Sequence, residues 1–198
     1  MQIEWIAAGV VLLVGALAAK MMLEQLLLQR IGLAFTFGWA FLMALHFWEA
    51  GMGVFGGVAG LLPGMPPEVV VFWVLFLLAA APGIILIRAW LKTYDAVFPF
   101  LFERASAVFC TLLFALGLPS LVIMTAMLMP PRISRVLPSK GMAGTVTRGL
   151  EQAPLKIYLG VATPLSPWTR DELAAQRIPE RVRRAVNNRS GAASRPPG

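Results

Sequence analysis

Charged side chains, cysteine and histidine are all scarce in this sequence, and each shortage excludes a class of protein. Only 14% of the 198 residues are charged, whereas roughly a quarter are charged in a soluble globular domain. The single cysteine, Cys110, cannot form an intrachain disulfide bond, and inside an apolar run it is expected to pack as a small hydrophobic side chain. The single histidine, His46, excludes a histidine-rich metal site, so no metal ligands are predicted.

Catalytic motifs are also missing. The sequence contains no Gly-x-Ser-x-Gly elbow, no phosphate-binding loop and no dinucleotide-binding glycine pattern. The glycine-rich residues 51–60 lack the Lys-Ser/Thr pair that a phosphate loop requires. We therefore expect a protein that is not an enzyme and that uses no cofactor.

Long apolar runs dominate what is present. Hydrophobic residues make up 58% of the chain, and the mean hydropathy is +0.74. The predicted fold class is an all-α integral membrane protein, with about four transmembrane helices in a domain over residues 1–131. Each run approaches the ~20 residues that a helix needs to cross a bilayer, and the helices are predicted at residues 5–28, 31–50, 69–91 and 105–129.

Short segments rich in glycine, proline or polar residues separate these runs. Gln29 and Arg30 are predicted to form the hinge of an antiparallel hairpin between the first two helices. Residues 51–68 hold six glycines and three prolines, and because glycine disfavours helix we expect an apolar loop in the membrane interface. A re-entrant segment is the alternative for this loop. Pro82 and Pro119 predict kinks in the third and fourth helices.

The C-terminal residues 132–198 carry most of the positive charge. They hold 12 basic and four acidic side chains, a net charge of +8, whereas residues 1–130 hold five basic and six acidic side chains, a net charge of −1. Low hydrophobicity combined with high charge predicts a largely disordered tail. Thr169 and Glu172 have the spacing of a capping box, which predicts a short amphipathic helix near residues 170–188.

This basic tail is expected to lie on lipid rather than on nucleic acid. Basic residues beside membrane spans are attracted to anionic head groups, and the arginine cluster at residues 181–184 has no interleaved aromatic residues with which to stack on bases. The expected partners are the lipid bilayer and, in addition, other membrane subunits or a second copy of the chain. The predicted lipid-surface contacts are Arg132, Arg135, Lys140, Arg177, Arg181 and Arg184.

Two pairs of ionisable side chains interrupt the apolar runs. His46 and Glu49 are three residues apart, and Lys20 and Glu24 are four apart, so each pair shares one helix face. Ionisable residues within a membrane suggest a proton or ion pathway. We favour a structural interpretation for both pairs, because Trp48 suggests a membrane interface and Lys20 can extend towards the head groups.

Two closely joined apolar runs, a looser middle segment, a third run, a short amphipathic connection and a fourth run follow one another along residues 5–131. Residues 26–49 and 72–131 carry this layout, with Gln29-Arg30-Ile31-Gly32 after the first run and Glu103-Arg104-Ala105 before the last. The layout resembles the colicin V production protein family of bacterial inner-membrane proteins. The resemblance implies a multi-pass protein of that membrane, which supports bacteriocin production or secretion and envelope homeostasis without catalytic activity.

The same layout is compatible with two other functions. An accessory subunit of a larger membrane complex would also be a small hydrophobic chain, and its polar tail would become ordered on a partner. A small transporter or channel would use His46, Glu49 and the proline-kinked helices.

The tail is predicted to lie in the cytoplasm. Counting basic residues in the short loops gives nearly equal support to both orientations. Exporting the tail would move a net charge of +8 against the membrane potential, at about 2.3 kcal/mol per charge per 100 mV. A fluorescent protein fused after Gly198 is expected to fluoresce in the cytoplasm, whereas alkaline phosphatase activity in the periplasm from a fusion at the same residue would contradict the prediction.

Overall fold

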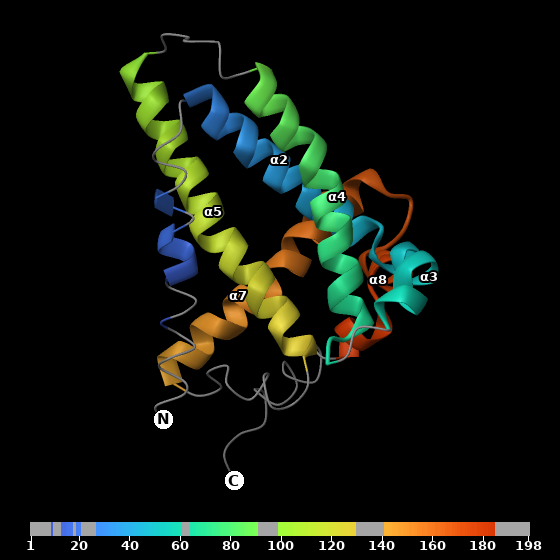
Figure 1. Cartoon of the computed structure of the whole chain (residues 1–198). Coiled ribbons are helices and arrows are strands. Elements are labelled where there is room, and N and C mark those ends of the chain that lie inside the picture. The colour runs from blue at the N-terminus through green and yellow to red at the C-terminus, as the bar shows by residue number, and fades with distance from the viewer. Residues whose placement is uncertain are drawn as a thin grey trace.

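The structure is a computed structural model of the whole chain, and it describes residues 9, 13–17, 19–20, 27–60, 64–90, 99–129 and 141–184. Within these ranges the regular structure is helical and no strand is present. Figure 1 shows long helices packed along one another, with shorter helices gathered near one end. The prediction of an all-α fold is confirmed for this part of the chain.

In the described part, three helices are long enough and apolar enough to cross a membrane: α2 (Leu27–His46), α4 (Pro67–Trp90) and α5 (Phe100–Leu128). They correspond to the second, third and fourth predicted runs, but α2 begins and ends four residues before the predicted range 31–50, and α5 begins five residues before the predicted residue 105. The predicted hinge at Gln29 and Arg30 is wrong, because α2 passes through both residues without a break. Neither residue is glycine or proline, and both have good helix propensity.

The first predicted run, residues 5–28, lies largely outside the described residues. Its described pieces at residues 13–17 and 19–20 are helical. Gly15 lies directly against α5, since a Cβ atom placed on it would be 2.9 Å from the Ala115 carbonyl oxygen. A fourth crossing therefore stays a prediction.

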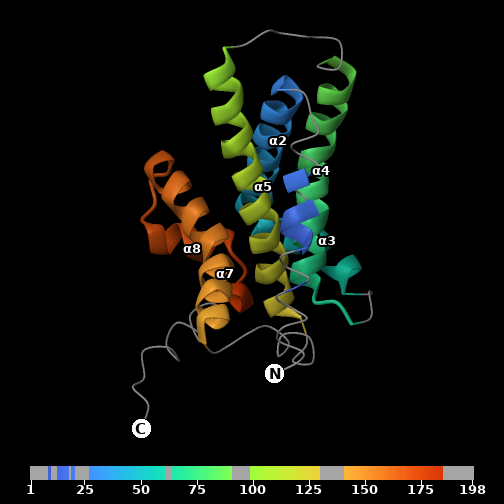
Figure 2. The same cartoon turned by 90° about the vertical axis from the view of Figure 1, so that its left-hand side faces the viewer.

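Helix α2 is packed between α4 and α5. Figures 1 and 2 show α4 and α5 on either side of α2, with α4 running in the opposite direction to both. Glycine makes each contact close: a Cβ atom on Gly83 would lie 2.5 Å from the Thr36 side chain, and one on Gly117 would lie 2.9 Å from the Phe37 ring. Small residues at such positions allow helices in a membrane to approach and gain packing contacts.

The apolar loop predicted over residues 51–68 is wrong for its first half, because α3 (Trp48–Ala59) is a helix. Glycine costs helix stability when the helix is exposed, but here packing compensates for that cost. Gly51 is buried against α4, where a Cβ atom would lie 2.8 Å from the Leu75 side chain.

The expectation of a largely disordered tail is wrong for residues 141–184. These residues form α7 (Gly141–Ala162), a short 3-10 helix η2 (Thr163–Leu165) and α8 (Arg170–Arg177), and a helical turn at residues 180–184 follows. The structure makes no statement about residues 185–198.

Aromatic and β-branched side chains explain why this segment is ordered. Tyr158, Ile178 and Val182 are each 1% exposed and belong to the same buried cluster as Trp48 and Phe72. The segment therefore buries enough apolar surface to offset its conformational entropy.

The capping box predicted at the start of the short helix is confirmed. Thr169 is the N-cap of α8, its hydroxyl oxygen accepts a hydrogen bond from the Glu172 N–H, and its own N–H donates to the Glu172 carboxylate at 2.8 Å. These bonds lower the pKa of Glu172, so the carboxylate stays ionised at neutral pH. Pro179 interrupts the helix as predicted, since α8 ends at Arg177.

We expect Ile178→Ala to release the C-terminal segment from the bundle. The substitution removes a fully buried side chain, which should cost about 2–4 kcal/mol. Limited trypsin digestion in mild detergent should then cleave faster after Arg181, Arg183 and Arg184. Leu165→Ala is the matched control, because Leu165 is 83% exposed in the same segment; equal cleavage rates in the two variants would contradict the prediction.

Candidate functional site

Glu68 connects three parts of the chain at one end of the bundle. Its main-chain carbonyl oxygen accepts a hydrogen bond of 2.9 Å from Nε1 of the fully buried Trp48. Its carboxylate pairs with Nη1 of Arg181 at 3.4 Å. The sequence suggests a membrane interface for Trp48, but the structure buries the ring inside the protein, with its centroid 5.0 Å from that of Phe72.

His46, the last residue of α2, contacts Tyr158 of α7. His46 Nδ1 and the Tyr158 hydroxyl oxygen share a hydrogen bond of 3.1 Å, between residues 112 positions apart in the sequence. Burial raises the pKa of the Tyr158 hydroxyl, and the positive charge of Arg177 opposes this shift. The phenol therefore stays protonated at neutral pH and is available for hydrogen bonding.

A cavity of about 430 Å³ lies beside this pair. Its walls come from α2, from the end of α7 and from the segment between η2 and the end of α8, including Trp39, His46, Tyr158, Trp168 and Arg177. The Arg177 guanidinium carbon lies 5.3 Å from the centre of the Trp168 ring, which is a cation–π contact. Most of its wall is hydrocarbon, and we call this cavity the polar pocket for the few polar side chains in it.

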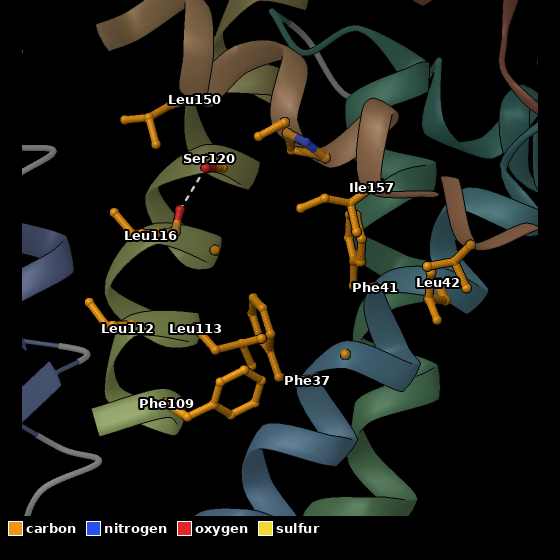
Figure 3. Close-up of a pocket in the computed structure, with 15 residues that line it drawn as sticks. Phe37, Phe41, Leu42, Phe109, Leu112, Leu113, Leu116, Ser120, Leu150 and Ile157 are labelled. Carbon is orange, nitrogen blue, oxygen red and sulfur yellow. Dashed lines mark hydrogen bonds between the residues drawn. The ribbon is translucent and has the colours of Figure 1, made fainter. Parts of the chain in front are cut away.

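A second cavity of about 550 Å³ lies between α2, α5 and α7. Figure 3 shows side chains of all three helices converging on it, among them Phe37, Phe41, Leu112 and Ile157. The wall is almost entirely hydrocarbon. The one hydroxyl in it, that of Ser120, donates a hydrogen bond of 2.6 Å to the Leu116 carbonyl oxygen of its own helix. We call this cavity the apolar groove.

The structure places the two predicted polar pairs differently. His46 is bonded to Tyr158, whereas Glu49 is exposed, and no hydrogen bond or ion pair joins them in the described part of the chain. Lys20 is exposed, and Glu24 lies outside the described residues. The described residues thus supply a partner for His46 that the spacing of residues along the chain did not suggest.

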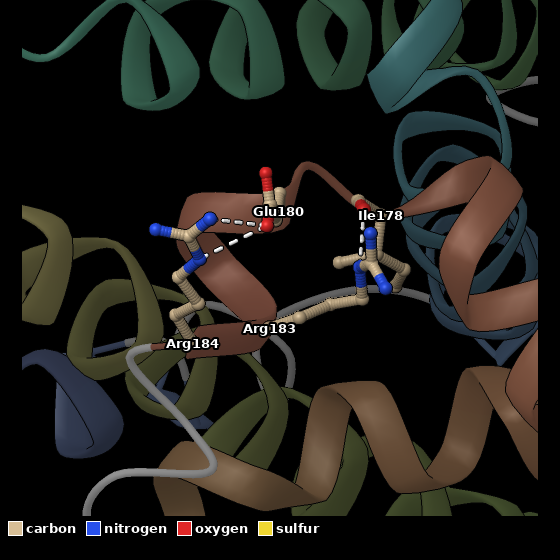
Figure 4. Close-up of polar contacts among 4 residues, drawn as sticks. All are labelled: Ile178, Glu180, Arg183 and Arg184. Carbon is tan, nitrogen blue, oxygen red and sulfur yellow. Dashed lines mark hydrogen bonds and ion pairs between the residues drawn. The ribbon is translucent and has the colours of Figure 1, made fainter.

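The predicted lipid-surface arginines are partly engaged in contacts within the protein. Arg184 pairs with Glu180, and the neighbouring Arg183 donates a hydrogen bond of 3.1 Å to the Ile178 carbonyl oxygen, as Figure 4 shows. The hydrogen bond from Arg184, and after it the Arg184 charge, lower the pKa of Glu180. Arg181 reaches Glu68, but its side chain is still 59% exposed. Three further predicted contacts lie outside the described residues: Arg132, Arg135 and Lys140.

Among the residues that the structure describes, no group of three or more His, Cys, Asp or Glu side chains could hold a metal ion. Comparisons with protein-family models, with curated proteins and with solved structures found no match to this chain. The interpretation of the site therefore depends on its own geometry.

Tyr158 and Trp168 were not predicted to be parts of this site. The chain has only two tyrosines and six tryptophans, and aromatic side chains in a segment assigned to disorder were an available signal, because disordered segments contain few aromatic residues. The contact of Tyr158 with His46 could not be identified from the sequence, since it spans 112 positions.

We expect Tyr158→Phe to change the electronic environment of His46 while leaving the fold intact. The ring stays in place, and the loss of one hydrogen bond should cost about 1 kcal/mol of stability. The chain has a single histidine, so ¹⁵N-labelled histidine gives unambiguous NMR signals, and the Nδ1 shift should move. Thr163→Val is the control, because the Thr163 hydroxyl bonds only to the Leu159 carbonyl oxygen one turn away. An Nδ1 shift identical to that of the wild type in Tyr158→Phe would refute the contact.

Proposed function

We propose that this chain is a non-enzymatic, multi-pass protein of the bacterial inner membrane that supports secretion or envelope homeostasis, as the resemblance to colicin V production proteins implies. In this proposal α2, α4 and α5 cross the bilayer with the first apolar run as a fourth span. The segment of residues 141–184 packs alongside α5 and contacts the end of α2 and α3, and we place the end of the bundle that it contacts in the cytoplasm.

The observation that carries the proposal is the apolar outer surface of the long helices. Large hydrophobic side chains on α4 and α5 are more than half exposed; examples are Leu77, Ile85, Leu101, Val108 and Phe109. A monomeric soluble protein rarely exposes so much contiguous apolar surface. Lipid acyl chains are the environment in which such a surface is stable.

A second candidate function is that of an accessory subunit in a membrane complex. Helix α3 packs against α4 and α8 and exposes Val54 and Val58 at 72% and 70%. A Cβ atom placed on Gly53 or Gly57 of the same helix would meet nothing within 4 Å. A partner helix could approach this face closely. Purification in mild detergent followed by mass measurement separates the two candidates, since a subunit would co-purify with other chains.

Deletion of the gene in its own bacterium tests the proposed function. The deletion strain is expected to become sensitive to detergents and to export less bacteriocin, and the wild-type gene should restore both properties. Glu49→Gln should restore them equally well, because Glu49 is exposed and carries no described contact. A deletion strain indistinguishable from its parent would overturn the proposal, and failure of Glu49→Gln to restore function would favour an intramembrane role for that carboxylate.

A further inference from the structure

The polar pocket and the apolar groove adjoin each other. Leu42 of α2 and Val161 of α7 line both cavities. One end of the combined space is therefore hydrocarbon, and the other end carries a cation, an imidazole, a phenol and an indole. The polarity of the wall therefore rises from one end of the space to the other, as the polarity of a lipid rises from its acyl chains to its head group.

The apolar groove suits an acyl chain. Its volume of about 550 Å³ lies within the roughly 300–1,000 Å³ of small-molecule sites in proteins. The walls belong to α2 and α5, two candidate spans, and to α7, so on the proposed membrane location the α2 and α5 walls lie at the depth of the bilayer hydrocarbon. Since Ser120 bonds to its own helix, no side-chain polar group among the lining residues lacks a hydrogen-bond partner.

The polar pocket suits an anionic head group because of Arg177. Within the described ranges, no carboxylate forms an ion pair with this guanidinium, and its buried Nε has no hydrogen-bond partner. A phosphate in the pocket would supply the opposite charge that this guanidinium lacks within the described ranges. Guanidinium groups bind phosphate through two parallel hydrogen bonds. The Trp168 ring contacts the guanidinium, which limits its orientation in the pocket.

We propose that the two cavities together bind one anionic phospholipid of the surrounding bilayer, with its phosphate at Arg177 and one acyl chain in the apolar groove. The proposal depends on the membrane location argued above. Tyr158 and His46, joined by their hydrogen bond, line the polar pocket between α2 and α7.

The first test measures lipid binding by the full chain purified in mild detergent. Native mass spectrometry with added phosphatidylglycerol or phosphatidylcholine should show one retained lipid and a preference for the anionic one. Inorganic phosphate at millimolar concentration should not compete, because it lacks the acyl chain. Retention of both lipids equally, or full competition by phosphate, would overturn the proposal.

Variants at both ends of the site sharpen the test. Arg177→Gln should weaken phosphatidylglycerol binding about tenfold, since it removes a charged hydrogen bond. Arg170→Gln is the matched control, because Arg170 is an exposed arginine at the other end of α8. Equal affinities in these two variants would refute the role of Arg177.

Leu116→Trp should reduce the binding of both lipids by filling the apolar groove, whereas Leu101→Trp, which lies outside the groove and is 80% exposed, should bind as the wild type does. If Leu116→Trp retains lipid, or if the purified chain is a dimer that carries none, a second copy or another segment occupies the groove and the proposal fails.

Lipid binding without a deletion phenotype would refute only the proposed function, and a phenotype without binding would refute only this inference.

Discussion

The first turn of α4 holds the contacts on which one whole end of the molecule depends. Glu68 is 8% exposed, and through its carbonyl and carboxylate it contacts Trp48 of α3 and Arg181 of the C-terminal segment. Removing one partner of a buried ion pair typically costs about 3–5 kcal/mol, because the other charge stays buried; the exposure of Arg181 places this pair below that range. The position of α3 and that of residues 178–182 are therefore coupled through Glu68 as well as through the buried apolar cluster that they share.

Close helix contacts then set the position of everything else. Thr36 and Phe37 are neighbours on α2, and they contact Gly83 of α4 and Gly117 of α5 respectively. A larger residue at either glycine would push α2 away from one neighbour. Because α7 packs on α5 and reaches α2, the space between these helices, the apolar groove, has a size fixed by the same contacts. The groove is thus a consequence of how α2 is held, rather than of its own lining residues alone.

The sequence was sufficient to predict the elements whose formation depends on residues close together in the chain. Apolar runs of spanning length predicted α2, α4 and α5, and the spacing of Thr169 and Glu172 predicted the start of α8, because a capping box involves only four consecutive residues. The glycines of α3 gave the wrong prediction, since their helix depends on packing against α4. The order of residues 141–184 was missed for the same reason: Tyr158, Ile178 and Val182 are buried by residues far away in the chain.

The C-terminal region has a net charge of +8, but its arginines make different contacts in the folded chain. Arg181 and Arg184 are paired with Glu68 and Glu180, so their charges are partly neutralised before they reach any lipid. Arg177 differs from both: it faces a cavity and an indole ring, and no described carboxylate pairs with it. A surface charge attracts head groups without selecting among them. A guanidinium at the mouth of a hydrocarbon groove can require a phosphate and an acyl chain in one molecule, and that combination is how a membrane protein distinguishes a bound lipid from the bilayer around it.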